Sequence, residues 1–217
     1  KNIQVDIPIV GHVKEILPKL AQEVVKTNSE EWLRKIQQWK KDHPLRYGPE
    51  KEKILPQHVI ETIAKVTNHE AIVATDVGQN QMWAAQFFKF KRARHFMTSG
   101  GLGAMGYGFP AAMGVQVAKP DDIVIDIAGD GSILMNIQEL TTVVENNLPV
   151  KIAILNNNFL GMVRQWQEFF YEKRYAMSYF DALPDFVALT RSYGHTGIQV
   201  ANPADVRGAL EQALGRK

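Results

Sequence analysis

The chain has 217 residues, of which 45% are hydrophobic and 22% are charged, and its formal net charge is +2. These values are typical of a soluble α/β protein with one substantial core, and so small a net charge gives no reason to expect a nucleic-acid partner. The absence of cysteine excludes disulfides and thiolate metal sites, and no apolar run reaches the roughly eighteen residues that a membrane-spanning helix needs.

Residues 1–40 predict mainly helical structure that belongs to a longer protein, because the chain starts without an initiator Met or a signal sequence. Trp32, Ile36 and Trp39 recur at helical spacing and form an apolar stripe that needs a packing partner, which we expect to lie outside this chain. Residues 41–53 are charged and contain two prolines and a glycine. They predict a linker between two domains.

From residue 54 onward, strand and helix patterns alternate. We expect strands at residues 71–77, 95–98, 123–128, 151–155 and 197–200, and helices at 56–66, 79–88, 105–117, 132–146, 161–170, 185–192 and 203–214. Such alternation predicts an α/β domain over residues 54–217, with a doubly wound parallel sheet and helices on both faces. Ligands of such folds bind at the carboxyl ends of the strands.

Two polar loops follow neighbouring apolar runs. Asp130 lies between two glycines directly after residues 123–128, and Asn157 closes the next run, residues 151–155. A carboxylate and an amide oxygen suit Mg²⁺, which completes its octahedron with phosphate and water. Glycines allow the backbone to approach an anion closely, and a helix from Ser132 would direct its N–H groups at that anion. The pair therefore predicts a metal–diphosphate site.

Taken alone, Gly-Asp-Gly is usually only a turn and Asn-Asn only a loop. The order strand, Gly-Asp-Gly, helix, strand, Asn-Asn has the length that a right-handed βαβ unit needs, and it resembles the signature of enzymes that use thiamine diphosphate (thiamine pyrophosphate, TPP). Three further segments resemble the catalytic subunit of acetohydroxyacid synthase (acetolactate synthase). They read DVGQNQMW at 76–83, SGGLGAMGYG at 99–108 and LGMVRQWQ at 160–167.

The resemblance implies a role for individual residues. It assigns Mg²⁺ to Asp130, the side chain of Asn157 and the main-chain carbonyl of Phe159. It assigns cofactor binding to these loops, through Val77, Gly78, Gln79, Asn80, Gly103, Met105, Gly129, Asp130, Gly131, Ser132, Asn157, Gly161 and Met162. Met105 would hold the cofactor in its bent form, and Trp166 would line the substrate channel and help to select the second keto acid. A buried core methionine and a buried helix tryptophan remain the ordinary alternatives for these two side chains.

The resemblance also implies an activity. The family decarboxylates pyruvate and condenses the two-carbon unit with pyruvate or 2-ketobutyrate, in branched-chain amino-acid biosynthesis. It implies a homodimer or tetramer of catalytic subunits, a regulatory small subunit, and a location in the cytoplasm or in an organelle. Residues 1–40 correspond to the tail of the family's middle, flavin-binding domain. The pyrimidine-binding domain, with its essential glutamate, has no counterpart in the chain, so we expect this fragment alone to be inactive.

Two positions depart from the family pattern. Asn80 stands where the family commonly has His, which removes a titratable group and argues against proton transfer there. His12 stands where the family commonly has Asp, near the flavin adenine. Together with the absence of the rest of that domain, this argues against FAD binding by this chain, although FAD belongs to the full-length protein of the family.

Three alternatives stay open at this point. Residues 101–106 match the dinucleotide fingerprint, with Asp126 as the acidic partner, so a nicotinamide oxidoreductase is one alternative. A second is another TPP enzyme, such as a glyoxylate carboligase or a sulfoacetaldehyde-processing relative. The third is a non-catalytic assembly module that uses the exposed aromatic faces around Trp32 and Trp39.

Overall fold

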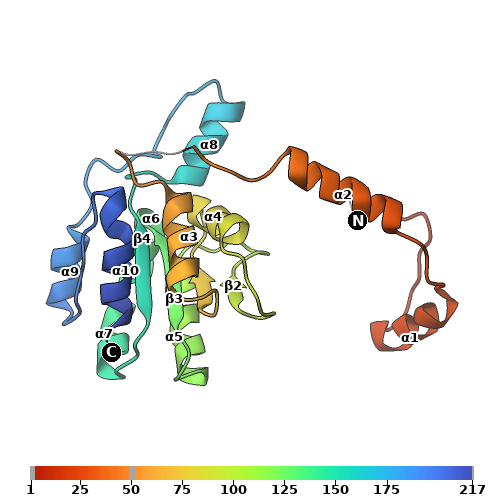
Figure 1. The fold of residues 1–217 in the computed structure, drawn as a ribbon, viewed down its shortest axis with the longest axis horizontal. Helices are drawn as coiled ribbons and strands as arrows, with labels where there is room; N and C mark the ends of the chain where they lie inside the picture. The colour runs from red at the N-terminus through yellow and green to blue at the C-terminus, as the bar shows by residue number, and fades with distance from the viewer. Residues whose placement is uncertain (1–2, 49–51, 217) are drawn as a thin grey trace. The chain divides into compact units, whose positions relative to one another are not determined.

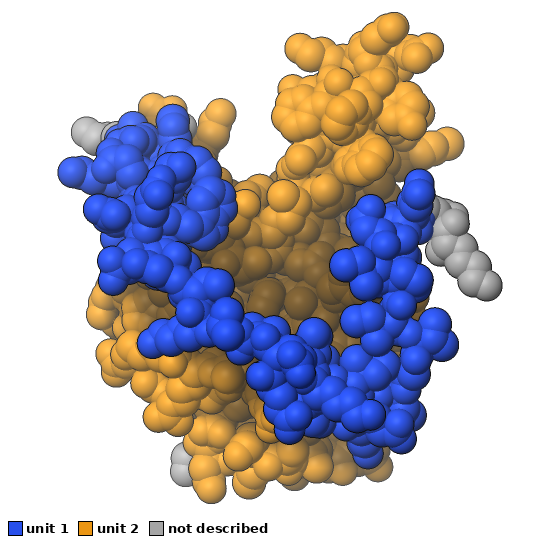
Figure 2. Space-filling view, turned by 90° about the vertical axis from the view of Figure 1, so that its right-hand side faces the viewer, with its two compact units in different colours: residues 1–46 blue, residues 47–217 orange. Residues whose placement is uncertain are grey.

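The structure is a computed structural model, and it describes residues 3–48 and 52–216. The chain divides into two compact units, residues 1–46 and 47–217, which Figure 2 colours separately. The predicted linker, residues 41–53, includes positions 49–51, which lie outside the described residues.

The first unit contains two helices, α1 (Val13–Glu23) and α2 (Glu30–Asp42). Helix α2 confirms the helical spacing predicted for Trp32, Ile36 and Trp39. Trp32 and Trp39 pack edge to face, with ring centroids 5.4 Å apart, because residues seven apart lie on one face of a helix. Each tryptophan is still about half exposed, at 55% and 52%, so this stripe buries little apolar area within the unit.

The second unit is built on a four-stranded parallel sheet in the order β2–β1–β3–β4. The strands are β1 (Ile72–Thr75), β2 (Phe96–Thr98), β3 (Val124–Gly129) and β4 (Lys151–Leu155). After β1 the chain moves outward to β2 and then returns to the other side of β1 to form β3. This reversal makes the carboxyl ends of β1 and β3 the switch point of the sheet, where ligands of such folds bind.

Helices cover both faces of this sheet, which confirms the predicted fold class (Figure 1). On one face, α3 (Pro56–Val66), α4 (Gln79–Phe87) and α10 (Val206–Leu214) pack against alternate residues of β1 and β3. On the other face lie α5 (Gly108–Ala118), α7 (Leu140–Glu145) and α9 (Phe186–Ser192). Because both faces are covered, the strands read as continuous apolar runs. In the described part of the chain no helix is long and apolar enough to cross a membrane.

Four predicted elements were wrong in detail. The helix expected from residue 105 begins at Gly108, because Gly103 and Gly106 adopt positive φ angles of 66° and 85° in the preceding loop. The helix expected over residues 132–146 is divided into α6 (Asp130–Ile133), a 3₁₀ turn η1 (Ile137–Glu139) and α7. At the break, the side chain of Asn136 donates a hydrogen bond to the carbonyl of Gly106, at 2.6 Å.

The third wrong element is the strand expected at residues 197–200, which has no strand geometry. A Cβ added at Gly197 would lie 2.9 Å from the Cα of Val187, so this segment packs closely on α9 rather than against an edge of the sheet. The final helix is also divided, into a 3₁₀ turn η2 (Pro203–Asp205) and α10. Helix α8 (Gly161–Phe170) follows the prediction.

Candidate cofactor-binding site

The predicted site loops lie at one edge of the sheet. Because β1, β3 and β4 are parallel, the segments that follow them, beginning at Asp76, Asp130 and Asn156, leave the sheet at the same end. Helix α8 lies at this end of the unit in Figure 1. The topology therefore gathers residues that are up to eighty positions apart in the sequence.

Asp130 joins two of these loops through its carboxylate. Oδ1 accepts the backbone N–H of Gly131 at 2.7 Å, and Oδ2 accepts those of Asn157 at 3.0 Å and Asn158 at 2.6 Å. The residue is 1% exposed. Hydrogen bonds to a carboxylate are stronger than those between neutral groups, and a buried carboxylate without partners is costly. Asp130 therefore fixes the position of the Asn157 loop relative to β3.

The loop after β4 is held from its other side as well. Oδ1 of Asn157 accepts the backbone N–H of Phe159 at 3.0 Å. The Leu160 N–H donates to the Ser178 carbonyl at 2.8 Å, and the Phe180 N–H donates to the Asn158 carbonyl at 2.9 Å. These bonds form a short antiparallel bridge, in which Phe159 pairs with Tyr179. The loop that carries the predicted ligands is therefore held between Asp130 and residues 178–180.

A small cavity of about 160 Å³ opens at this loop. Four of the predicted cofactor and metal residues line it, namely Gln79, Asn157, Phe159 and Gly161, together with Arg164, Gln165, Glu168 and Phe169. The cavity wall is thus mainly polar. In the described part of the chain no three His, Asp or Glu side chains group as metal ligands, so a cation here would depend on one carboxylate with amide and carbonyl oxygens.

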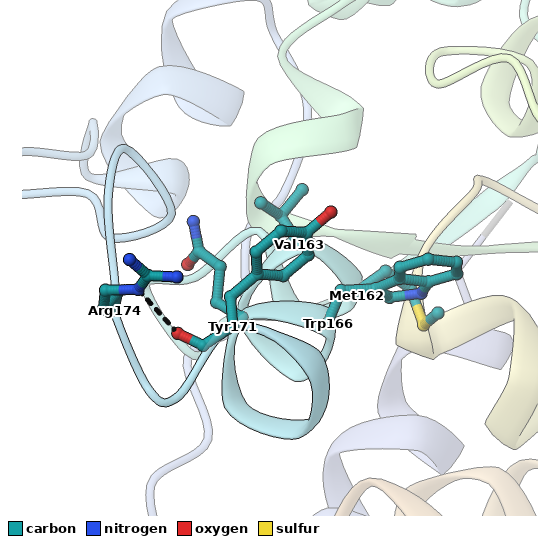
Figure 3. A pocket seen from close by; sticks show the side chains of 6 residues that line it. Met162, Val163, Trp166, Tyr171 and Arg174 are labelled. Atoms are coloured by element: carbon teal, nitrogen blue, oxygen red, sulfur yellow. Dashed lines mark hydrogen bonds between the residues drawn. The ribbon is translucent and has the colours of Figure 1, made fainter.

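A second, broader pocket of about 530 Å³ lies beside α8 (Figure 3). Met162 and Trp166 line it with Val163, Gln167, Tyr171 and Arg174. The Nε–H of Arg174 donates to the Tyr171 carbonyl at 3.3 Å, which ties the end of α8 to the following loop. Trp166 is 55% exposed, so the ordinary alternative of a buried core tryptophan does not hold within this chain.

The remaining predicted residues do not line either of these two cavities. The Asn80 side chain is buried and donates to the carbonyls of Asp76 at 3.1 Å and Ile127 at 2.9 Å. It joins β1 to β3. The Ser132 hydroxyl bonds with both backbone groups of Gly129, at 3.0 and 3.2 Å. Gly103 lies near Val77, since a Cβ added at Gly103 would be 3.9 Å from the Val77 Cγ1. Met105 is half-buried in the loop before α5.

Two buried carboxyl groups flank the start of α5. Oδ1 of Asp76 accepts the Gly108 N–H at 2.9 Å, whereas both oxygens of Asp126 are without a hydrogen-bond partner. Burial raises the pKa of Asp126 well above its usual value, and the negative charge of Asp76 raises it further. Burial also raises the pKa of Asp76, although the N–H groups of Gly108 and Gly106 oppose this rise.

The position of Asp126 counts against the nicotinamide alternative. Asp126 lies inside β3, directly beside Ala74 of β1 in the sheet register, and is 0% exposed. A ribose hydroxyl needs an accessible carboxylate at the end of a strand. The acidic residue that completes the dinucleotide pattern in the sequence is therefore closed off in the fold.

The sequence pattern did not single out Arg164 as a member of the site. Its guanidinium lies over the rings of Phe159, at 4.4 Å, and Tyr175, at 5.5 Å. The signal available in the sequence was the helical spacing from Gly161, because residues three and four positions later lie over it on one face of α8. The same helical spacing from Gly161 indicates Gln165 as a second residue of the site.

The parallel sheet with glycine-rich loops at its switch point defines an α/β cofactor-binding domain. The family described as "Thiamine pyrophosphate enzyme, C-terminal TPP binding domain" matches residues 76–217. The chain therefore belongs to the thiamine pyrophosphate enzyme family, and these residues form its C-terminal TPP-binding domain.

Relatives that match over the whole chain include large subunits of acetolactate synthase. The chain is 46% identical to the "Acetolactate synthase isozyme 3 large subunit" of Escherichia coli, over 99% of this chain and 38% of that protein. It is 46% identical to the Haemophilus influenzae large subunit, over 100% of this chain and 39% of that protein. It is 43% identical to "Acetolactate synthase 1, chloroplastic" of Oryza sativa, over 99% of this chain and 35% of that protein. The chain is homologous to these proteins but spans less than two fifths of their length.

Proposed function

We propose that this chain is the TPP- and Mg²⁺-binding part of an acetolactate synthase large subunit. The whole enzyme would decarboxylate pyruvate and condense the two-carbon unit with pyruvate or 2-ketobutyrate. The observation that carries the proposal is the bridge from Asp130 to the backbone of Asn157 and Asn158, at 3.0 and 2.6 Å, beside a polar cavity. It holds the two loops of the TPP signature against each other.

The donors around Asp130 fit a Mg²⁺ ion. A carboxylate offers about four lone-pair sites, and three backbone N–H groups bond to Asp130, so acceptor capacity remains for a cation. Oδ1 of Asn157 and the carbonyl of Phe159 are the other hard donors of this loop, and Asn157 and Phe159 both line the cavity. One carboxylate with neutral oxygens is the donor set that Mg²⁺ uses together with a substrate phosphate.

The surrounding backbone fits a diphosphate. Gly78, Gly131 and Gly161 bring the chain close to its neighbours, since a Cβ added at Gly131 would lie 2.8 Å from the Phe180 ring. Gln79 begins α4 at the edge of the cavity, where the N-terminal end of a helix favours negative charge. When bound, TPP supplies the electron sink that the decarboxylation of a 2-keto acid requires.

The broad pocket beside α8 is the proposed substrate approach. Met162 and Trp166 are four residues apart on α8 and line it together, which supports the channel role proposed for Trp166. Met105 is proposed to contact the pyrimidine end of the cofactor, with Gly103, from the loop before α5. The role of these side chains is to orient the cofactor and the substrate and to keep water out.

Isothermal titration calorimetry of the chain with TPP and Mg²⁺ tests the proposal. We expect one site per chain, no uptake when EDTA removes the metal, and no heat from a nicotinamide dinucleotide. A thermal-shift series should show stabilisation that grows with TPP concentration, because a ligand that binds only the folded state stabilises it by mass action. A folded chain with no uptake of TPP in the presence of Mg²⁺ would overturn the proposal.

The properties of the whole enzyme are proposed from its resemblance to these relatives. They comprise a homodimer or tetramer of large subunits, a regulatory small subunit, and a location in the cytoplasm, as expected for the bacterial relatives, or in an organelle. We propose that residues 1–40 are a remnant of a flavin-binding domain and that residues 54–217 are the diphosphate-binding domain. The family's essential glutamate belongs to another domain, so we propose that the 217 residues alone have negligible carboligase activity. Acetolactate formation by this chain would contradict that.

A further inference from the structure

Gln79 and Gln165 join α4 to α8 through their side chains. Nε2 of Gln79 donates a hydrogen bond to Oε1 of Gln165 at 2.9 Å, across 86 positions of sequence. Both residues line the small cavity with Asn157 and Phe159. The contact depends on Gly161, because a Cβ at that position would lie 2.8 Å from Cδ of Gln79 and would displace its amide.

The bond decides which end of the Gln79 amide is the donor end. A glutamine amide has two N–H donors on one atom and an acceptor on the other, and rotation about the last side-chain torsion exchanges them. Because Gln165 accepts one N–H of Gln79, the carbonyl end of Gln79 is directed away from that contact, toward Gly161. Nε2 of Gln79 makes no second hydrogen bond among the described residues, so its other N–H remains available to a ligand. An anion that reaches Nε2 would meet a donor.

We propose that Gln165 is a positioning residue, which holds the amide of Gln79 so that its free N–H donates to the diphosphate oxygens of the cofactor. This inference rests on the proposed TPP site and adds to it a residue one helical turn beyond Gly161. The same bond ties α8, and with it Met162 and Trp166, to the first turn of α4. Loss of the acceptor at position 165 leaves the Gln79 amide free to rotate. Binding of the ligand must then fix that rotation, which weakens binding.

A double-mutant cycle tests the inference on the chain. Gln165→Met and Gln79→Met keep side-chain length and helix propensity but remove the amides, and the double variant completes the cycle. We expect Gln165→Met to raise the Kd for TPP with Mg²⁺ about three- to tenfold, the weakening that loss of one hydrogen bond between neutral groups produces. In the Gln79→Met background, Gln165→Met should have no further effect on the Kd for TPP. Gln212→Met, on the exposed surface of α10, is the matched control.

Each outcome of the cycle either supports or overturns the inference. Equal effects of Gln165→Met in both backgrounds mean that Gln165 acts independently of Gln79 and overturn the inference, as does an unchanged Kd in the single variant. If the unaltered, folded chain takes up no TPP, the proposed function fails and this inference fails with it. If it does take up TPP and only the cycle is additive, the inference alone fails. Circular dichroism melting checks each variant, and Gln165→Leu replaces Gln165→Met if the latter does not fold.

Discussion

Oδ2 of Asp130 lies 2.6 Å from the backbone nitrogen of Asn158, and the two residues follow neighbouring parallel strands. The same oxygen also accepts the Asn157 N–H at 3.0 Å. One buried carboxylate therefore both positions the loop after β4 and supplies the negative charge that a cation at this edge needs. Its two roles can be separated experimentally, because the first affects stability and the second affects ligand uptake.

Asp130→Asn should lower both the stability of the chain and its uptake of TPP with Mg²⁺. An asparagine side chain has only one acceptor atom, so it cannot accept from Gly131 on one side and from Asn157 and Asn158 on the other. We expect the free energy of unfolding to fall by about 1–3 kcal/mol and the uptake of TPP with Mg²⁺ to be lost. Urea denaturation and calorimetry measure the two effects. Asp181→Asn, at an exposed position, is the control; retained TPP uptake by Asp130→Asn would contradict the proposed metal role.

Asp126→Asn should change the pH dependence of stability. The pKa of Asp126 is raised in the folded chain by burial and by the charge of Asp76. Above an unfolded pKa of about 4, the unfolded chain has released this proton while the folded chain keeps it, so stability falls with rising pH until the folded pKa is passed. Asparagine has no proton to release. We expect the Tm of the variant, relative to the unaltered chain, to be higher near neutral pH than near pH 4.

The control for this series is Asp121→Asn, which changes an exposed carboxyl near the same strand. A pH-dependent change in Tm that both variants share would come from net charge and not from the buried carboxyl. A Tm difference for Asp126→Asn that does not change with pH would mean that Asp126 does not hold an extra proton in the folded state.

Gly131→Ala should destabilise the site loop by steric overlap. The added Cβ would lie 2.8 Å from Cζ of Phe180 and 2.9 Å from Cδ2 of Leu160, closer than packed carbons approach. Overpacking of this kind costs about 1–3 kcal/mol. Gly114→Ala is the matched change, because a Cβ there meets nothing within 4 Å and the site is inside α5. It should stabilise by about 0.5–1 kcal/mol. Equal losses in both variants would contradict the steric explanation.

Gln116→Leu should destabilise the end of α5. The buried side-chain amide donates to the carbonyls of Lys119, Pro120 and Asp122 at 3.0, 3.3 and 3.2 Å. A leucine leaves these carbonyls without that donor, which should lower the free energy of unfolding by about 1–3 kcal/mol. Chemical denaturation measures the change, and Gln212→Leu, at an exposed position of α10, should change stability by less than about 0.5 kcal/mol.

The alternation of strand and helix patterns was sufficient to predict the fold class, because parallel strands covered on both faces read as apolar runs and amphipathic helices repeat with a period of 3.6 residues. The helix predicted over residues 132–146 was wrong because its break is set by a distant contact, the bond from Asn136 to the Gly106 carbonyl. Local periodicity carries no information about such a partner.

The sequence by itself determined which polar residues follow each strand, since Asp130 and Asn157 end apolar runs. Only the tertiary structure decided their partners. The register of the sheet brings the carboxylate of Asp130 onto the backbone of Asn158. The packing of helices around the sheet buries Asp126 under α5 without a partner and places Gln165 against Gln79. The physical reason is that side-chain contacts at the switch point join strands and helices far apart in the chain, where their distances depend on packing and not on spacing along the sequence.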